Sequence, residues 1–270
     1  MSLLNPTFRD QIRMILVRSL AFNFLFYANI TVLSFLGLPT LLMKRSAVQE
    51  LARLWSRNSL WLLDKVCGTK VEFRGLEHLP RGACIIAAKH LSALETFALT
   101  TQMGDFTFVL KRELMSIPIF GWYLKGAGQI GIERAKRGQA LTDLTRQVRQ
   151  AVTEGRQIFI FPEGTRRPVG APPDYKTGVA HLCAATQATC VPVALNSGLF
   201  WPRRGILRRP GIVVIEFLEP IEPGVDKHKF MSVLQSRIET ATATLIADSI
   251  AADPSLKAAL PDQLDAAATN

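Results

Sequence analysis

Hydrophobic residues follow two different patterns along the chain, and the pattern changes near residue 66. From Ser19 to Met43 apolar residues follow one another without a charge. As a helix, these roughly 25 residues would span about 38 Å, which is more than the roughly 30 Å hydrocarbon core of a bilayer. The apolar part of a signal peptide is only about 7–15 residues long and precedes a cleavage site, whereas this run ends in Lys44 and Arg45. The run therefore predicts a retained membrane segment.

The sequence leaves open whether this segment crosses the bilayer or enters and leaves one leaflet. Gly37 and Pro39 interrupt it, and basic residues flank both of its ends, so the positive-inside rule gives no orientation. The next stretch, 47–66, has one apolar helical face, made of Val48, Leu51, Trp55, Leu62 and Val66. Two interpretations stay open for this helix: an amphipathic helix at the membrane interface, or a helix that packs on the domain behind it.

Beyond Gly68 the hydrophobic residues occur in short, β-rich runs. Seven strands are predicted, at 71–73, 83–88, 106–110, 129–132, 157–161, 190–195 and 211–217. Helical patterns lie between or after them, at 140–153, 178–185 and 230–248. Strands that alternate with helices predict an α/β fold with a mostly parallel central sheet flanked by helices.

The predicted organisation therefore has three parts. Residues 1–66 form an N-terminal membrane-associated helical segment, and residues 67–250 form one α/β domain. The stretch 251–270, rich in Ala, Asp and Pro, is predicted to be a flexible tail.

Composition adds an anionic partner to this picture. The formal net charge is +10, and 48% of the residues are hydrophobic. Nucleic acid, a phospholipid surface and a phosphorylated substrate all suit a basic chain, but no run of Lys and Arg exceeds two residues, which argues against nucleic acid. The four cysteines lack C-x-x-C spacing and are predicted to be buried free thiols in a reducing compartment. The four histidines are scattered, so no metal site is expected.

Polar residues follow four of the predicted strands. His90 comes shortly after the run ACIIAA, Lys111 follows FTFVL, and Arg134 comes soon after QIGI. The sequence PEGTR, at 162–166, follows QIFIF in the same way. Because functional groups gather at the carboxyl ends of parallel strands, these residues are expected to lie along one edge of the sheet.

The stretch AKHLSALET, at 88–96, has two interpretations. His90 with Glu95 resembles a general base held by a carboxylate, which fixes the imidazole tautomer and stabilises the imidazolium. No attacking side chain is evident, so the activated hydroxyl would belong to a substrate. Alternatively, Ser92 and Glu95 form the capping box of a following helix. These residues alone do not decide between the two.

The stretch PEGTRR, at 162–167, also has two interpretations. Gly164 permits a tight turn whose backbone N–H groups could join Arg166 in binding an oxyanion or phosphate. The P-loop pattern is absent, which removes the usual nucleotide-binding interpretation. The alternative is a surface turn with a helix cap.

Taken in order, these blocks resemble the glycerolipid acyltransferase family. They are His90-x4-Glu95, GIER at 131–134, FPEGTR at 161–166 and VPVAL at 191–195. The stretches KHLSALETF, FVLKREL, IFGWYLK and FWPRR are similar to those of bacterial enzymes that acylate 1-acyl-sn-glycerol-3-phosphate. The resemblance covers about residues 70 to 220.

The resemblance implies a reaction and a role for each matching residue. His90 would be the general base that draws a proton from the lysophospholipid hydroxyl, and Glu95 would orient it. That oxygen would attack the thioester of acyl-CoA or acyl-carrier protein directly, without an acyl-enzyme, to give phosphatidic acid. The acceptor phosphate would be bound by Lys111, Arg134, Glu163, Gly164, Thr165 and Arg166, with Glu163 and Gly164 shaping the loop. The acyl-binding region would include Val191, Pro192 and Val193.

The same resemblance implies that no cofactor or metal is needed and that the bilayer is a partner. It places the protein on a bacterial inner membrane with the active site on the cytoplasmic side. Two departures bear on this expectation: Glu95 and Glu133 stand where the family more often has Asp.

Three rival functions remain at this stage. One is acylation of another lyso-lipid, such as a lyso-ornithine lipid. Another is non-catalytic binding of anionic lipids at a membrane. The third is lipid hydrolysis, although no G-x-S-x-G nucleophile turn supports it.

Overall fold

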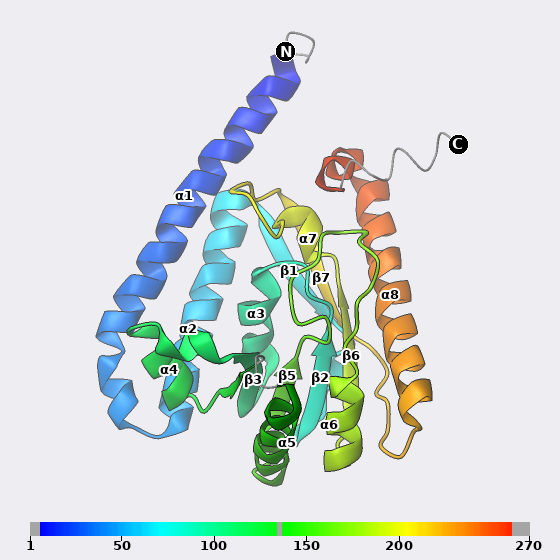
Figure 1. Cartoon of the computed structure of the whole chain (residues 1–270). Helices are drawn as coiled ribbons and strands as arrows, with labels where there is room; N and C mark the ends of the chain where they lie inside the picture. Colours follow the sequence, from blue (N-terminus) through cyan, green and yellow to red (C-terminus); the bar gives the residue numbers. More distant parts are fainter. Residues whose placement is uncertain (1–5, 134–136, 261–270) are drawn as a thin grey trace.

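The computed structural model describes residues 6–133 and 137–260, and its centre is one sheet with helices on both faces (Figure 1). The strands lie in the order β1-β7-β6-β2-β5-β3-β4. Their bounds are β1 Thr69–Arg74, β2 Cys84–Ala88, β3 Phe106–Lys111, β4 Ile130–Ile132, β5 Gln157–Ile160, β6 Cys190–Leu195 and β7 Gly211–Phe217. All seven predicted strands are confirmed.

The sheet is mostly parallel, as predicted. Among the described residues, β6 with β7 is the one antiparallel pair of strands, and the other neighbours run parallel. The central strand β2 has the unbroken apolar sequence CIIAA, and every residue in it is buried. A strand covered on both faces has no polar side to present to water, which explains why the run does not alternate.

Helices form a layer on each face of the sheet. Their bounds are α1 Pro6–Leu36, α2 Arg45–Leu62, α3 Leu94–Ala98, α4 Phe120–Gly126, α5 Arg137–Thr153, α6 Gly178–Thr186, α7 Ser197–Phe200 and α8 Lys227–Ala252. Ile86 of β2 packs into a cluster with residues of α1 and α3, whereas its neighbour Ile85 packs with residues of α5, α6 and α8. Adjacent strand residues point to opposite faces, so each layer has its own core.

Short 3₁₀ and π segments connect these elements. They are η1 Leu38–Leu42, η2 Leu63–Cys67, η3 Leu76–His78, η4 Leu99–Gln102, η5 Arg112–Ser116 and η6 Pro254–Ala259. The cysteines of the chain are buried and free, as predicted.

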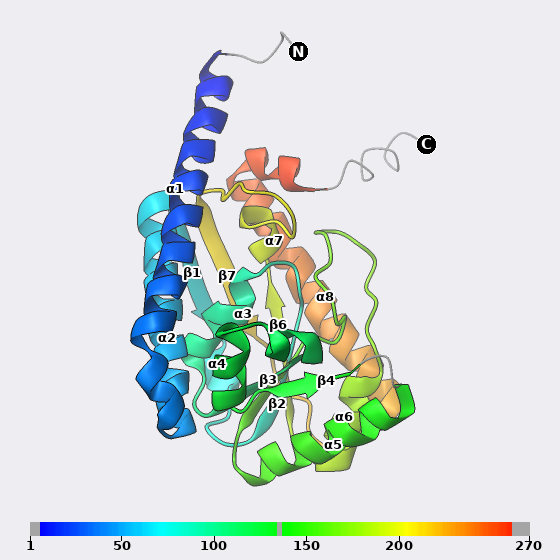
Figure 2. The same ribbon diagram turned by 60° about the vertical axis from the view of Figure 1, so that its left-hand side comes forward.

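Helix α1 lies along one side of the body and projects beyond it at its N-terminal end (Figure 2). The helix ends just before Gly37, where a Cβ atom would approach the Leu51 side chain to 2.1 Å and the Leu33 carbonyl oxygen to 2.7 Å. After the turn η1, helix α2 returns beside α1 (Figure 1). The uncharged run at 19–43 is therefore a helix and a turn rather than one continuous helix.

Helix α2 packs on the body with the apolar face predicted for it. Val48 is buried, and Trp55 packs against the core cluster that contains Ile86. Phe22 of α1 belongs to the same cluster. Of the two interpretations of the 47–66 helix, the structure therefore favours packing on the domain, and the segment 1–66 shares its core with the α/β body.

The predicted flexible tail begins with ordered structure instead. Residues 251 and 252 complete α8, and η6 places Leu256 in the core with 2% of its surface exposed. Asp253 caps η6 by accepting the backbone N–H of Ser255 at 3.0 Å. Residues 261–270 lie outside the described residues.

Candidate active site

His90 lies where the chain leaves the carboxyl end of β2. Its Nδ1 is 3.0 Å from Oε1 of Glu95, whose side chain is fully buried. A carboxylate only accepts hydrogen bonds, so Nδ1 carries the proton and Nε2 is the basic nitrogen of the neutral ring. The pair therefore has the tautomer that a general base requires.

Glu95 is surrounded by donors. Its Oε1 also accepts the backbone N–H groups of Leu91 at 2.8 Å and Ser92 at 2.7 Å. Its Oε2 accepts the hydroxyl of Ser197 at 2.8 Å. These donors satisfy the hydrogen-bonding oxygens of the buried carboxylate and fix its orientation.

Hydrogen bonds around Glu95 also match the helix-start pattern predicted for this stretch. The Ser92 N–H donates back to Glu95, and the Leu94 N–H donates to Ser92 Oγ at 3.1 Å, at the start of α3. The two bonds resemble those of a capping box, but they are made by Ser92, one residue before the N-cap residue Ala93 of α3. Both interpretations of AKHLSALET therefore hold, because the helix start holds the carboxylate against His90.

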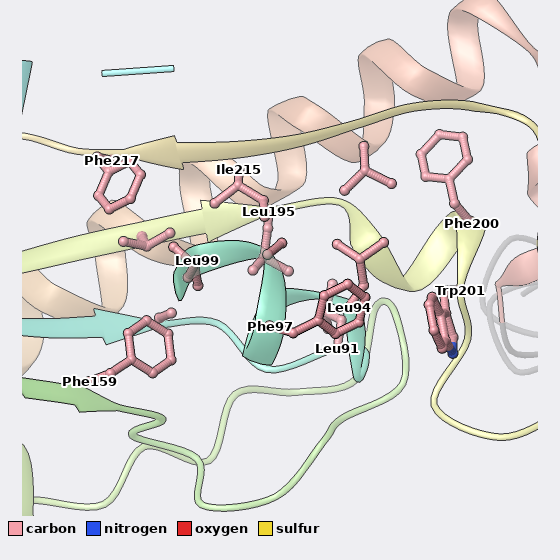
Figure 3. Close-up of a cluster of buried hydrophobic side chains, with 14 of the residues drawn as sticks. Leu91, Leu94, Phe97, Leu99, Phe159, Leu195, Phe200, Trp201, Ile215 and Phe217 are labelled. Carbon is pink, nitrogen blue, oxygen red and sulfur yellow. The ribbon is translucent and has the colours of Figure 1, made fainter. Parts of the chain in front are cut away.

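Buried apolar side chains pack around the segment that carries His90 and Glu95. Figure 3 shows Leu91, Leu94 and Phe97 gathered with Phe200 and Trp201 in one apolar cluster. The rings of Phe97 and Trp201 are 5.9 Å apart. The segment that carries Glu95 is thus packed on both sides.

Phe161 fixes the imidazole ring. Its ring stacks on that of His90, with 3.7 Å between centroids and 17° between planes. Phe161 directly precedes the PEGTR loop, so the stacking places this loop beside the imidazole. The backbone N–H of Arg167 donates to the His90 carbonyl at 2.8 Å, which is a second contact between this loop and His90.

Glu163 lies inside this loop and borders the cavity described below, but its carboxylate is bound by other groups of the protein. Its carboxylate forms an ion pair with Lys89 Nζ at 3.0 Å, and the side chains are 0% and 3% exposed. Its other oxygen accepts the His90 backbone N–H at 3.4 Å. These contacts make Glu163 an anchor of the loop, in line with the loop-shaping role predicted for it, and a direct contact of Glu163 with phosphate stays a prediction.

Gly164 forms the tight turn predicted for it. Its φ is 65°, in the left-handed region that glycine adopts most easily. Its N–H donates to the Phe161 carbonyl at 2.9 Å, so the turn itself uses the donor proposed for an oxyanion.

The predicted cations lie at the same edge of the sheet as His90. Strands β2, β5 and β3 are parallel neighbours, so their carboxyl ends meet. Lys111 ends β3, and Thr165 and Arg166 follow β5. All three line the cavity described below. Arg134 lies outside the described residues.

The predicted acyl-binding residues do not reach the cavity. Val191, Pro192 and Val193 lie in β6, between β2 and β7, and all three are buried. Val191 and Val193 belong to the core cluster under α3. Their position gives them a packing role behind the strand that carries His90.

A cavity of about 830 Å³ opens beside His90. Most of its wall is apolar and comes from α1, α2, α3, α4 and β3, including Leu33, Leu51, Trp55, Phe97, Phe108 and Leu124. Its polar part holds His90, Lys111, Thr165, Arg166 and Lys176. The arrangement suits an elongated apolar ligand with an anionic group close to the imidazole.

Several residues of the site were not predicted from the sequence. Lys89 also binds Glu239 of α8 at 2.7 Å, and the Tyr175 hydroxyl donates to the same carboxylate at 2.7 Å. Burial, and the charges of Glu239 and Glu163, raise the pKa of Tyr175 well above its usual value, so its hydroxyl stays a donor. Lys89 could have been found from the sequence, because it directly follows an apolar strand. Glu239 and Ser197 could not, because they are distant in sequence from His90.

This buried network gives a stability prediction. Replacing Lys89 with methionine leaves the Glu163 carboxylate buried without its cation, which should lower the free energy of unfolding by about 3–5 kcal/mol. The control is Glu219→Gln, which removes the exposed pair with Arg237 and should cost at most about 1 kcal/mol. Chemical denaturation measures both, and equal losses would contradict the assignment.

The chain is similar to known acyltransferases. The family model described as Acyltransferase matches residues 70–196. A 1-acyl-sn-glycerol-3-phosphate acyltransferase of Pseudomonas aeruginosa is 36% identical over 202 residues, which are 74% of this chain and 78% of that protein. The enzyme of that name from Saccharomyces cerevisiae is 28% identical over 165 residues, which are 59% of this chain and 54% of that one.

A solved structure supports the fold. The crystal structure of a 1-acyl-sn-glycerophosphate (LPA) acyltransferase from Thermotoga maritima matches with a TM-score of 0.72 at 20% identity. The match covers 85% of this chain and 96% of that one, which shows that the two chains share a fold.

Proposed function

The chain belongs to the acyltransferase family, and from this premise we propose that it acylates the free hydroxyl of 1-acyl-sn-glycerol-3-phosphate and so forms phosphatidic acid. The acyl donor is a thioester, either acyl-CoA or acyl-carrier protein. The observation that carries the proposal is the His90–Glu95 pair, 3.0 Å apart, at the polar end of an apolar cavity.

In the proposed reaction, Nε2 of His90 takes the proton of the acceptor hydroxyl. The oxygen attacks the thioester carbonyl, the C–S bond breaks, and the proton passes from the imidazolium to the leaving thiolate. The Glu95 carboxylate, held by its other donors, stabilises the imidazolium that forms between these steps.

Transfer without an acyl-enzyme is supported by the hydroxyls around His90. Ser92 Oγ accepts from the Leu94 N–H, and Ser197 Oγ donates to the far oxygen of Glu95. Neither contacts the imidazole as a nucleophile paired with a base would. The acceptor hydroxyl is then the nucleophile.

The acceptor phosphate is proposed to lie beside Lys111, Thr165 and Arg166, with Arg134 as a further ligand from the sequence. Lys176 also lines the cavity, and its Nζ pairs with the exposed Asp174 at 2.7 Å. An arginine matches phosphate geometry better than a lysine does, so Arg166 is the proposed main contact.

Membrane attachment is proposed to occur through α1. The helix from Asp10 to Leu36 is long and apolar enough to cross a membrane, and only 11% of its most apolar window is buried. Two residues near the end of this helix, Leu33 and Ser34, line the cavity. A lipid could then move between bilayer and cavity without exposing its chain to water, which saves about 0.8 kcal/mol per CH₂. We place the site on the cytoplasmic side of a bacterial inner membrane.

A panel of acceptors tests the proposal. Purified protein in vesicles receives acyl-CoA or acyl-carrier protein together with 1-acyl-sn-glycerol-3-phosphate, lysophosphatidylcholine or a lyso-ornithine lipid. Phosphatidic acid should form at least about 10-fold faster than the other diacyl products, because only this acceptor has a terminal phosphate for Arg166. A folded, lipid-bound protein that acylates none of them would overturn the proposal.

A further inference from the structure

Large apolar side chains are exposed on the segment that leads into α4. Ile117 is 45% exposed, Phe120 40% and Trp122 51%. The segment belongs to the catalytic body rather than to the N-terminal helices. The function proposed above uses only the side of it that faces the cavity.

This segment is joined to the end of α1. The Tyr123 hydroxyl donates to the backbone carbonyl of Ser34 at 2.7 Å. The exposed large apolar residues at this end are Phe35 and Leu36 of α1, Leu38 and Leu42 of η1, and Met43, with Leu42 exposed to 93%. A Cβ atom on Gly126 would touch Leu41 at 3.3 Å, so the end of α4 also contacts η1. The apolar surface of α1 therefore continues onto the body.

The backbone at the start of α4 is strained. Ile119 has a φ of 63°, a rare conformation for a β-branched residue. The turn is also tight, because a Cβ atom on Gly121 would approach the Met115 carbonyl oxygen to 2.2 Å. Strain of this kind clusters at functional segments, and the strained Ile119 directly precedes the stretch that contains the exposed Phe120 and Trp122.

The other side of the same segment forms part of the cavity wall. Phe120, Tyr123 and Leu124 line the cavity, whose polar part contains His90. Lys125 is exposed next to them, where a cation would meet lipid phosphates. The segment thus has an outer apolar surface, an inner surface on the cavity and a basic flank.

We propose that residues 117–122 are a second membrane contact, inserted among the acyl chains of one leaflet beside α1. The segment forms the border across which the lysophospholipid passes from the bilayer to the cavity. The partner is the lipid bilayer, since the surface continues the apolar face of a helix long enough to span one. The identity of the passing lipid rests on the proposed function, whereas the membrane contact does not.

The kinetic test uses the double variant Ile117→Ser/Trp122→Ser, since neither side chain lines the cavity. The matched control is Leu76→Ser/Ile212→Ser, because these side chains are 41% and 51% exposed away from α4. With a long-chain acceptor in phosphatidylcholine vesicles, kcat/KM of the test variant should fall at least 10-fold. With a short-chain acceptor dissolved as monomers, both variants should stay within two-fold of the parent protein.

Two results separate the ideas. The membrane contact is overturned if the kcat/KM of the test variant in vesicles equals that of its control. It is also overturned if the kcat/KM of the test variant falls as much with the dissolved acceptor as in vesicles. A parent protein that acylates neither acceptor overturns the proposed function instead. Independently of activity, phosphatidylcholine with brominated chains should quench the tryptophan fluorescence of the parent protein, and Trp122→Phe should remove part of this quenching. Unchanged quenching in Trp122→Phe would overturn the inference.

Discussion

Replacing His90 with alanine is expected to lower kcat about 10²–10⁴-fold, the range measured for loss of a positioned general base. Without the imidazole, the acceptor hydroxyl must lose its proton to water while it attacks the thioester. Binding should change less, because the apolar wall and the cations remain. Steady-state kinetics with 1-acyl-sn-glycerol-3-phosphate and acyl-CoA measure the loss, and circular dichroism checks the fold.

The matched control is His181→Ala, which removes an exposed histidine of α6 and should leave kcat within two-fold. Added imidazole should restore part of the activity of His90→Ala, because the lost ring leaves a space beside Phe161. An unaffected kcat in His90→Ala would contradict the assignment of His90 as the general base, whereas a parent protein that binds anionic lipid but forms no product would support the rival function of non-catalytic lipid binding. Thioester loss without any acceptor in the parent protein would support hydrolysis.

The strands could be predicted well because they carry their own signal. In β2 and β6 the apolar runs are unbroken, as strands covered on both faces require, and both are fully buried. The order of the strands could not be predicted in the same way. It depends on which edges meet across long connections, and the antiparallel pairing of β6 with β7 has no local signature.

The end of the chain shows where composition misleads. Its Ala-rich, Pro-containing sequence is typical of a flexible tail, yet Leu256 is 2% exposed in the core. Leu256 in the core, Ala259 and Leu260 packed against it, and the Asp253 cap accompany the ordered η6. Composition averages over such residues, whereas packing depends on them.

The edge of the site could be predicted, but its interior could not. His90, Lys111 and Arg166 come at the carboxyl ends of predicted parallel strands, so the sequence predicted one common edge, and the neighbouring positions of β2, β5 and β3 bring these residues together there. Glu163 occurs in the expected loop, yet its direction is set by Lys89 and by Glu239 of the distant helix α8. The residues Val191 to Val193 are apolar in any context, and only the strand order shows that they lie behind the site.

Glu95 is the residue for which the sequence left the sharpest alternative, and its surroundings allow the charge to be removed with little change in shape. In Glu95→Gln the amide oxygen can take the place of Oε1 and accept from His90, Leu91 and Ser92. The amide nitrogen then replaces Oε2, and the Ser197 hydroxyl can rotate to accept from it. The hydrogen bonds persist, and only the negative charge is lost.

Glu95→Gln should therefore lower kcat at least about 10²-fold, because the imidazolium formed during transfer loses its counter-charge. The free energy of unfolding should change by at most about 1 kcal/mol. The control is Ser92→Ala, which removes the hydroxyl that accepts the Leu94 N–H; it should cost about 1 kcal/mol of stability with little effect on kcat. Denaturation and steady-state kinetics on both variants separate the two roles. If Glu95 only starts the helix, the two variants will resemble each other in both measurements, whereas a catalytic partner of His90 gives a stable protein with a slow reaction.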